Sequence, residues 1–467
     1  MIFKDCYIHL EITVMALAPE DIPLPHVLAG DWTRENLTTL ARQLGVIQRA
    51  RKKDVWLLLW TLLLGFSTGS KRTLVGLWET YNQYADRPVA SSSFQGWLSA
   101  SLATFLKHLC GQLIKENTPS LTLHGHLLER FTELIAIDST VINLHRFLRE
   151  HYKATAKTGA AAKLHAAINI LDANLKSLKL TGQRVGDGTP WKRLGPWVAG
   201  RLLLIDLGYY DFNLFSRIDD NGGFFVSRVK RTANPLIVKN LRPCRGRSIE
   251  VVGRHLQDVL GDLQRDVVDV VVALEVKKRK YKGKRRKELR RFRMVGLKRP
   301  DGGYFLYFTN LPSEEIPADD LASIYTLRWQ VELFFASLKG QGRLDQLPSS
   351  KKAVVEVLIW SSVLSDLCSR RLYRWLRTLV PQDRHLPPRR FSKVFSRVMA
   401  DVLDAVLEPE GQRGQRLLRR LLRTAPDPNR HRPDRSLQAI PKPAHEAEVV
   451  DLLQHRSTQG VQGKAAA

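Results

Sequence analysis

The chain has 467 residues, too many for one ordinary domain, and 44% of them are apolar, which suffices for packed cores. Lysine and arginine total 73 against 46 aspartate and glutamate residues, a formal net charge of +27. This excess attracts polyanions and gains affinity by displacing counterions from phosphates. A cationic membrane-binding protein would carry the same charge, but the sequence contains no basic amphipathic helix with a lipid-facing aromatic edge. Nucleic acid is therefore the favoured partner, and no membrane association is expected.

Cysteine use and apolar segments exclude further classes of protein. The cysteines lie far apart and form no CxxC pair, which argues against zinc ribbons, zinc fingers and a disulfide framework. They are Cys6, Cys110, Cys244 and Cys368. The longest apolar run, Val55–Phe66, is too short to span a bilayer and is typical of a buried helix. The first residues lack the pattern of a signal peptide. We expect a cytoplasmic protein of bacterial type, associated with the nucleoid when bound to DNA.

Residues from about Asp31 to about Leu128 are predicted to be helical, because apolar residues recur there at helical spacing. Ser67–Ser70 are predicted to open one helix, which Asp86–Pro88 ends, and Ser91–Ser93 are predicted to cap the next. Two helices joined by a short turn are typical of a helix-turn-helix that enters the DNA major groove. A helical bundle without base contacts has the same pattern. We interpret this region as a helical domain that binds DNA.

Beyond Glu129 the pattern changes to that of strands. Residues 134–138 and 202–206 are short apolar runs that each end in an aspartate. Residues 163–170 and 174–181 are predicted to be two strands joined by a turn. A helix and a further strand follow. This order predicts a mixed α/β sheet.

Residues 234–310 also have strand character and contain the most basic stretch of the chain. Two predicted strands, 267–276 and 292–298, bracket this stretch and indicate a hairpin with a basic tip. Most charge runs are solvated loops, but this one extends an ordered ribbon. We therefore expect phosphate contacts from the tip. The residues expected to make them are Lys284, Arg285 and Arg286.

A long helix is predicted from Pro317 to about Gly340, and helical segments continue to about Arg423. The last forty or so residues are rich in proline, arginine and polar residues and are predicted to be flexible. The predicted units are an N-terminal helical domain (1–128), the first part of a catalytic core (129–233), a β-rich insertion (234–310), the second part of the core (311–345), a C-terminal helical region (346–425) and a flexible tail (426–467).

Asp138 and Asp206, at the ends of two predicted strands, are the first candidates for chemistry. A carboxylate at the end of a buried strand emerges at the carboxyl edge of the sheet, where α/β folds tend to place ligands. One such aspartate is usually only a turn cap. Two on separate strands can converge, and two close carboxylates repel each other unless a cation lies between them. Mg²⁺ or Mn²⁺ would supply that cation, because both prefer hard oxygen ligands.

The predicted long helix carries a polar stripe formed by Tyr325, Arg328, Glu332 and Lys339. At about 100° per residue these positions fall within an arc of roughly 60°, opposite an apolar side. Glu332 would complete the metal site, Arg328 and Lys339 would contact phosphates, and Tyr325 would donate a hydrogen bond. An ordinary amphipathic helix explains Arg328 and Glu332 as an i, i+4 ion pair. It leaves Tyr325 and Lys339 unexplained.

These residues carry a resemblance to a known family. The pattern Y-x2-R-x3-E-x6-K, preceded by strand-Asp-Ser-Thr and by strand-Asp-x-Gly-Tyr-Tyr-Asp, resembles the insertion-sequence-4 family of DDE transposases over about residues 133–344. The resemblance implies an α/β, RNase H-like mixed sheet with a β-rich insertion, flanked by the N-terminal helical domain and C-terminal helices. It also implies a polynucleotidyl transferase and endonuclease that moves DNA by cut and paste.

The resemblance further implies roles for individual residues. Asp138, Asp206 and Glu332 would be the catalytic ligands of two Mg²⁺ (or Mn²⁺) ions, which activate the nucleophile and stabilise the leaving oxygen. The expected contacts to phosphates of the transposon ends are Tyr325, Arg328 and Lys339. Lys163 and His165 are expected to support the site from a neighbouring strand, although a lone strand histidine is more often packed than catalytic. The implied partners are double-stranded DNA (terminal inverted repeats and target) and a second copy of the chain in a synaptic complex.

One departure from the family leaves a step open. Some relatives release the element through a DNA hairpin, with a tryptophan of the β insertion stacked on a flipped base. Here no tryptophan occurs between Trp197 and Trp329. Trp329 could stack on a base or belong to the core, and further stacking candidates are Tyr281, Phe292 and Tyr304.

Two other functions are compatible with the sequence. The first keeps the fold and makes the chain a domesticated transposase or another RNase H-like nuclease. The second is a DNA-binding protein without catalysis, in which the carboxylates are structural. Metal-dependent cleavage that is lost on replacing Asp138 or Glu332 separates the enzyme from the binding protein.

Overall fold

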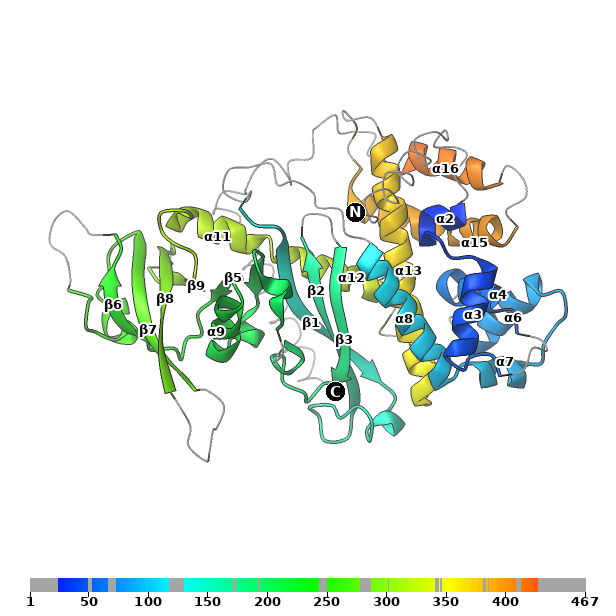
Figure 1. Cartoon of the computed structure of the whole chain (residues 1–467), viewed down its shortest axis with the longest axis horizontal. Coiled ribbons are helices and arrows are strands. Elements are labelled where there is room, and N and C mark those ends of the chain that lie inside the picture. The colour runs from blue at the N-terminus through cyan, green and yellow to red at the C-terminus, as the bar shows by residue number, and fades with distance from the viewer. Residues whose placement is uncertain are drawn as a thin grey trace, which may run out of the picture.

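The computed structural model describes residues 24–48, 53–65, 73–116, 130–170, 174–191, 194–242, 250–277, 287–300, 302–340, 344, 347–380, 384, 386–408 and 413–426. Strands at one end of the long axis continue into a central sheet, and helices from both ends of the chain gather at the other end (Figure 1). Within these residues, no helix combines the length and apolar character needed to cross a membrane.

The described strands form one mixed, nine-stranded sheet. They are β1 (Leu134–Leu144), β2 (Ala160–Asn169), β3 (Asn174–Gly182), β4 (Leu202–Ile205), β5 (Phe224–Arg228), β6 (Leu236–Asn240), β7 (Val267–Lys277), β8 (Lys287–Lys298) and β9 (Tyr304–Thr309). Their order in the sheet is β3-β2-β1-β4-β5-β9-β8-β7-β6. β4 pairs in parallel with β1 and β5, and the other pairs are antiparallel. The predicted mixed α/β sheet is confirmed.

β1 is longer than the sequence indicated. It does not end at Asp138 but runs on to Leu144, because β2 pairs with it along this whole stretch. β4 does end as predicted, at Ile205, and Asp206 follows directly. The Asp206 carboxylate accepts a hydrogen bond from the amide of Gly208 (3.2 Å) in a short 3₁₀ turn. Asp138 therefore lies within a strand and Asp206 at a strand end.

The β-rich segment extends the central sheet instead of forming a separate one, because β9 pairs with β5. The helix α9 (Phe212–Asp220) packs over one face with Phe308, and α11 (Ala318–Thr326) packs over the other with Tyr307. These two neighbouring residues of β9 point to opposite faces, as strand geometry requires. The short helix α10 (Leu256–Leu260) packs on the α9 side. β7 and β8 form the predicted hairpin, and its basic tip, with Lys284, Arg285 and Arg286, lies outside the described residues.

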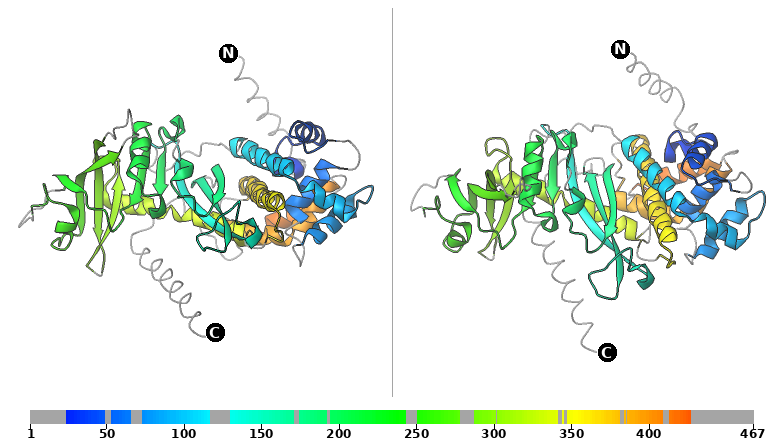
Figure 2. Two further views of the ribbon diagram at one scale, coloured as in Figure 1. Left: turned by 90° about the horizontal axis from the view of Figure 1, so that it is seen from below. Right: turned by 60° about the horizontal axis from the view of Figure 1, so that its bottom comes forward.

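Helices from both ends of the chain share one hydrophobic core. The N-terminal ones are α2 (Leu24–Ala29), α3 (Arg34–Gln43), α4 (Val55–Trp60), α6 (Leu74–Tyr84), α7 (Ser91–Trp97) and α8 (Ala100–Glu116). The C-terminal ones are α12 (Trp329–Gly340), α13 (Lys352–Leu379), α14 (Pro388–Arg397), α15 (Met399–Leu407) and α16 (Arg413–Thr424). α8 lies along α13, where the thiol of Cys110 contacts the carbonyl of Trp360 (3.8 Å). Figure 2 shows the same two helices side by side from other directions.

Helix boundaries in the N-terminal part differ from those predicted. The apolar run that begins at Val55 is buried as expected. The side chain of Thr73 caps α6 by accepting from the amide of Gly76 (3.0 Å), whereas Ser67–Ser70 lie outside the described residues. Ser91–Ser93 form the first turn of α7 and do not cap it. The helix predicted after these serines is in fact two, because the backbone leaves the helical conformation at Leu98.

Candidate active site

Asp138 and Asp206 lie at the same level of the sheet because their strands are parallel neighbours. Ile137 of β1 is opposite Ile205 of β4, and each aspartate is the residue that follows its isoleucine in the chain. Both isoleucines are fully buried, so the positions of the following carboxylates are fixed by packing. The expected convergence of the two aspartates thus follows from the register of β1 and β4.

The helix predicted from Pro317 to Gly340 is broken in the middle, which corrects that prediction. α11 ends at Thr326 and α12 begins at Trp329. At the break, the amide of Leu327 donates to the carbonyl of Ile324 (3.2 Å) and the amide of Arg328 to that of Tyr325 (3.0 Å), three residues back instead of four. α12 then runs between the central sheet and α13 (Figure 1).

Arg328, at this break, contacts all three predicted metal ligands. Its Nη1 lies 3.9 Å from Oδ2 of Asp138 and 3.8 Å from Oδ1 of Asp206. Its Nη2 donates to Oε1 of Glu332 at 2.6 Å. The Nε of Arg328 is buried and has no hydrogen-bond partner among the described residues. The structure therefore gathers three carboxylates around one guanidinium that is only partly satisfied.

The electrostatics of this cluster favour additional positive charge. Burial raises the pKa of Asp138 to about 7, and the nearby carboxylates of Asp206 and Glu332 add to the effect against the opposing influence of Arg328. Burial alone would lower the pKa of Arg328, but Tyr325, Asp206 and Glu332 outweigh it and raise this pKa above its ordinary value. Three acidic groups compete for one cation.

The donor set suits a hard divalent cation, because it consists of carboxylate oxygens without sulfur or imidazole. Within the described ranges, no three histidine, cysteine, aspartate or glutamate side chains already form a metal-binding group. The three carboxylates meet at Arg328 and not at one another. A divalent cation at this site would bind the oxygens that Arg328 now contacts, so the cation and the guanidinium exclude each other.

The other residues of the predicted polar stripe lie in different surroundings. Tyr325 is only 5% exposed, packs against Tyr307 with ring centroids 5.4 Å apart, and directs its hydroxyl toward the carbonyl of Ile205 (3.4 Å). Burial raises the pKa of Tyr325 to about 12. Lys339 and Trp329 are half-buried on α12, and Lys339 forms no ion pair with any described carboxylate. Their contacts to DNA stay predictions.

Lys163 and His165 lie on β2, the antiparallel neighbour of β1. Nζ of Lys163 donates to Oδ1 of Asp187 at 2.9 Å. His165 is fully buried and hydrogen-bonds the hydroxyls of Tyr209 (3.1 Å) and Thr181 (2.9 Å). Burial lowers the pKa of His165 to about 4, so the ring is neutral at physiological pH.

Asp187 was not predicted from the sequence. It follows β3 in an irregular segment, so no strand or helix period indicates its position. Its Oδ1 accepts from Oγ of Ser139 (3.1 Å) as well as from Lys163, and Ser139 is the residue after Asp138. The sequence feature that could have indicated Asp187 is its position between Gly186 and Gly188, since glycines let the backbone turn sharply around a polar residue.

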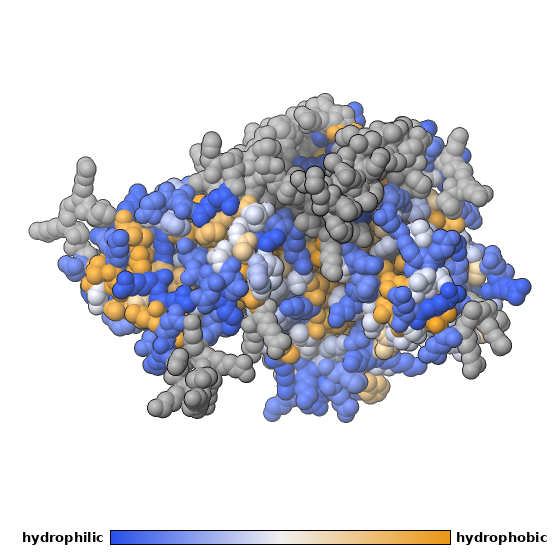
Figure 3. All heavy atoms as spheres, in the orientation of Figure 1, coloured by the Kyte–Doolittle hydropathy of each residue, from blue (hydrophilic) through white to orange (hydrophobic). Residues whose placement is uncertain are grey.

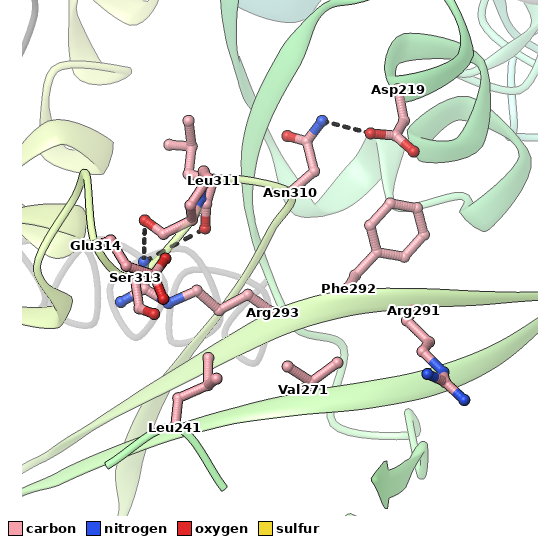
Figure 4. Close-up of a pocket in the computed structure, with 11 residues that line it drawn as sticks. Asp219, Leu241, Val271, Arg291, Phe292, Arg293, Asn310, Leu311, Ser313 and Glu314 are labelled. Carbon is pink, nitrogen blue, oxygen red and sulfur yellow. Dashed lines mark hydrogen bonds between the residues drawn. The ribbon is translucent and has the colours of Figure 1, made fainter. Parts of the chain in front are cut away.

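A buried ion pair anchors the segment that leads from β9 to α11. Arg293 of β8 binds Asp269 of β7 through two hydrogen bonds (2.8 and 2.6 Å). Its remaining nitrogen, Nη1, donates to the carbonyls of Leu311 (3.4 Å), Pro312 (3.3 Å) and Ile316 (2.7 Å). Figure 4 shows Arg293 reaching this segment across the pocket beside β8. The pair thus joins the β-rich segment to the helix that precedes Arg328.

The aromatic residues of the β-rich segment that could stack on a DNA base differ in their exposure. Phe292 is 3% exposed and packs against Phe225 and Phe308, so it cannot stack on a base, and that expectation was wrong. Tyr304 is partly buried and donates its hydroxyl to the carbonyl of Arg265 (2.5 Å). Tyr281 lies outside the described residues.

The sheet order and the carboxylate cluster define an RNase H-like α/β fold with an acidic site on its central strands. The family model described as "Transposase DDE domain" matches residues 129–365, about half of the chain, and the chain belongs to this family. The predicted resemblance to a DDE transposase of an insertion-sequence family is thereby confirmed. The matched region includes all three carboxylates: Asp138 in β1, Asp206 directly after β4, and Glu332 in α12.

The chain is also similar to individual proteins that are named as transposases. The chain is 23% identical over 393 residues to the transposase for insertion sequence element IS231F of Bacillus thuringiensis subsp. israelensis, with 75% of this chain and 80% of that protein covered. It is 36% identical over 63 residues to the putative transposase InsL for IS186A of Escherichia coli (strain K12), with 14% and 17% covered. A cryo-EM structure of the piggyBac transposase synaptic complex with hairpin DNA is similar with a TM-score of 0.43 and 9% identity, covering 88% of this chain and 87% of that one.

Proposed function

We propose that Asp138, Asp206 and Glu332 together hold two Mg²⁺ or Mn²⁺ ions, with which the protein cuts transposon ends and joins them to target DNA. The observation that carries this proposal is the convergence of all three carboxylates on the guanidinium of Arg328. Three acidic groups from two strands and a helix would repel one another without a cation. Arg328 supplies that cation in the metal-free protein.

The chemistry of the bound ions is activation of a water or a 3′-hydroxyl and stabilisation of the leaving oxygen in an in-line displacement at phosphorus. The chain holds the ligands at fixed levels, because β1 and β4 are buried and paired in register. Arg328, once free of the carboxylates, offers a planar guanidinium that suits a phosphate. Trp329 and Lys339, on α12 directly after Arg328, extend this contact along the DNA, and Tyr325 supports it from the end of α11.

Further contacts to double-stranded DNA are part of this proposal. The net charge of +27 favours an acidic partner, and the face drawn in Figure 3 is largely hydrophilic. We place DNA contacts on the N-terminal helices and on the hairpin tip with Lys284, Arg285 and Arg286. The substrates in this proposal are terminal inverted repeats and target DNA. Two copies of the chain would bring two transposon ends together in a synaptic complex.

Counting bound Mn²⁺ by electron paramagnetic resonance tests the metal site without relying on activity. We expect two ions per chain, and loss of at least one in Asp138→Asn and in Glu332→Gln. Glu356→Gln is the matched control, because Glu356 is a half-buried helical glutamate of α13 that contacts Tyr152. Unchanged Mn²⁺ binding in both site variants would remove the metal assignment.

A further inference from the structure

We infer that Asp187 is a positioning residue that sets the spacing of Asp138 and Asp206. This inference rests on the proposed metal site, and it assigns Asp187 no direct contact with metal or DNA. Asp187 comes from the irregular segment between β3 and β4, yet its carboxylate lies beside both strands that carry the aspartates.

The first contact is with β1. Oδ1 of Asp187 accepts from Oγ of Ser139 at 3.1 Å, while the amide of Ser139 donates to Oδ1 of Asp138 at 2.7 Å. Ser139 therefore links the two carboxylates through its side chain on one side and its backbone on the other. The hydrogen bond from the backbone amide of Ser139 orients the carboxylate of Asp138. The hydrogen bond to Asp187 in turn holds the side chain of Ser139 in place.

The second contact is with the turn after β4. A Cβ placed on Gly208 would lie 3.4 Å from Oδ2 of Asp187 and 3.7 Å from Oδ2 of Asp206. The two carboxylates therefore flank the same point of the backbone. The amide of Gly208 itself donates to Asp206 at 3.2 Å. The carboxylate of Asp187 therefore lies close to the turn that follows β4.

Lys163 makes this arrangement electrostatically possible. A further carboxylate beside Asp138 and Asp206 would otherwise add to their repulsion. Nζ of Lys163 lies 2.9 Å from Oδ1 of Asp187 and also donates to the carbonyl of Val185 at 3.4 Å. The lysine is 12% exposed and its partner 26%, so the ion pair is largely shielded from water. Asp187 is thus neutralised and anchored on β2, and its two oxygens point to β1 and to the turn after β4.

Replacing a residue that orients a metal ligand through a hydrogen bond commonly weakens metal binding about 10- to 100-fold. Asp187→Asn keeps the size of the side chain and one acceptor oxygen but removes the charge that pairs with Lys163. We therefore expect the Kd for Mn²⁺, measured by electron paramagnetic resonance on the full chain, to rise about tenfold or more. DNA affinity without metal should stay the same.

Asp211→Asn is the matched control. Asp211 also follows β4, but it caps α9 by accepting from the amide of Asn213 at 2.8 Å. Its replacement should lower the melting temperature without changing the Kd for Mn²⁺. A purely structural Asp187 would behave like this control. Folded Asp187→Asn with the wild-type Kd for Mn²⁺ would therefore overturn the inference.

A second variant distinguishes positioning from direct ligation. Lys163→Met leaves Asp187 charged and removes its anchor. If Asp187 acts by position, Mn²⁺ binding weakens in Lys163→Met as it does in Asp187→Asn. Tighter Mn²⁺ binding in Lys163→Met would show that the freed carboxylate ligates the ion, contrary to the inference. Absence of Mn²⁺ binding in the wild-type protein would instead refute the proposed function itself.

Discussion

The side chain of Arg328 donates to the carboxylate of Glu332, one helical turn further along, at 2.6 Å. The same guanidinium lies within 4 Å of Asp138 and Asp206. One arginine therefore contacts all three acidic groups that the proposed chemistry needs for metal. Because the guanidinium and the metal ions would bind the same oxygens, Arg328 and divalent ions should compete for this site.

Replacing Arg328 with methionine tests this competition. Without the guanidinium the carboxylates repel one another, so we expect the metal-free variant to lose roughly 1–3 kcal/mol of unfolding free energy. Saturating Mn²⁺ should then raise the melting temperature of Arg328→Met more than that of the wild type. Calorimetry with and without Mn²⁺ measures both effects.

Arg328→Lys is the control for this variant, because it keeps the charge but loses the planar, forked geometry. We expect its metal-free stability to lie between those of the wild type and Arg328→Met. Equal stabilisation of all three proteins by Mn²⁺ would contradict competition between the arginine and the metal.

Removing only one partner of the ion pair between Arg293 and Asp269 should strongly destabilise the protein. Both side chains are almost fully buried, at 4% and 7% exposure. Arg293→Met leaves Asp269 charged, buried and unpaired, and it frees three carbonyls of the segment before α11. We expect a loss of about 3–5 kcal/mol in chemical denaturation.

Replacing both partners provides the matching control. The variant Asp269→Leu with Arg293→Met removes the unpaired charge and should regain a substantial part of the lost stability. If the single and double variants were equally unstable, the effect would come from the freed carbonyls and not from the buried charge.

Because His165 is buried, we expect the free energy of unfolding to fall in mild acid. Burial lowers its pKa in the folded protein to about 4, against an ordinary value of 6.5. Between these values the unfolded chain binds a proton that the folded one does not, so stability falls as pH falls from about 6.5 toward 4. The expected contribution is roughly 2–3 kcal/mol between pH 7.5 and 4.5.

The variant His165→Gln keeps a polar group on β2 but does not titrate. Its free energy of unfolding, from denaturant titrations at several pH values, should depend less on pH than that of the wild type. A wild-type pH dependence in this variant would exclude His165 as the titrating group.

The basic hairpin tip should contribute to DNA affinity through phosphate contacts. Replacing Arg285 and Arg286 with alanine should weaken binding to all sequences and reduce the slope of log K against log salt by about 2. Fluorescence anisotropy across a salt series measures the slope. Ala replacements of Arg413 and Arg420, which pair with acidic residues, remove equal charge elsewhere and should leave the slope unchanged. A tip variant that matched this control would exclude phosphate contact at the tip.

Much of the core sheet could be predicted because its strands are short apolar runs with clear turns between them. The apolar runs before Asp138 and Asp206 predicted that both residues come at the carboxyl edge of the sheet. They did not predict that β1 continues to Leu144. That continuation depends on pairing with β2, a partner distant in sequence. Strand length is set by such pairing and not by the apolar run alone.

The features that depend on tertiary contacts were missed. The break between α11 and α12 is invisible in the helical period, because apolar residues keep their spacing across Leu327 and Arg328. Asp187 lies in a segment without period, and its place beside Gly208 arises only when β2, β1 and β4 are assembled. Residue type and spacing indicated which side chains are candidates for metal and DNA binding. They did not indicate which other residues fix the positions of those side chains.

Cleavage of the DNA that flanks this gene, with magnesium and with wild-type protein or Glu332→Gln, tests the central claim most directly. We predict nicks at matching positions in both flanks with the wild type, no nicks with the variant, and equal DNA binding by both proteins. Full cleavage by Glu332→Gln would contradict the assignment of Glu332 as a metal ligand. Binding without cleavage by the wild-type protein would contradict the proposed catalytic function.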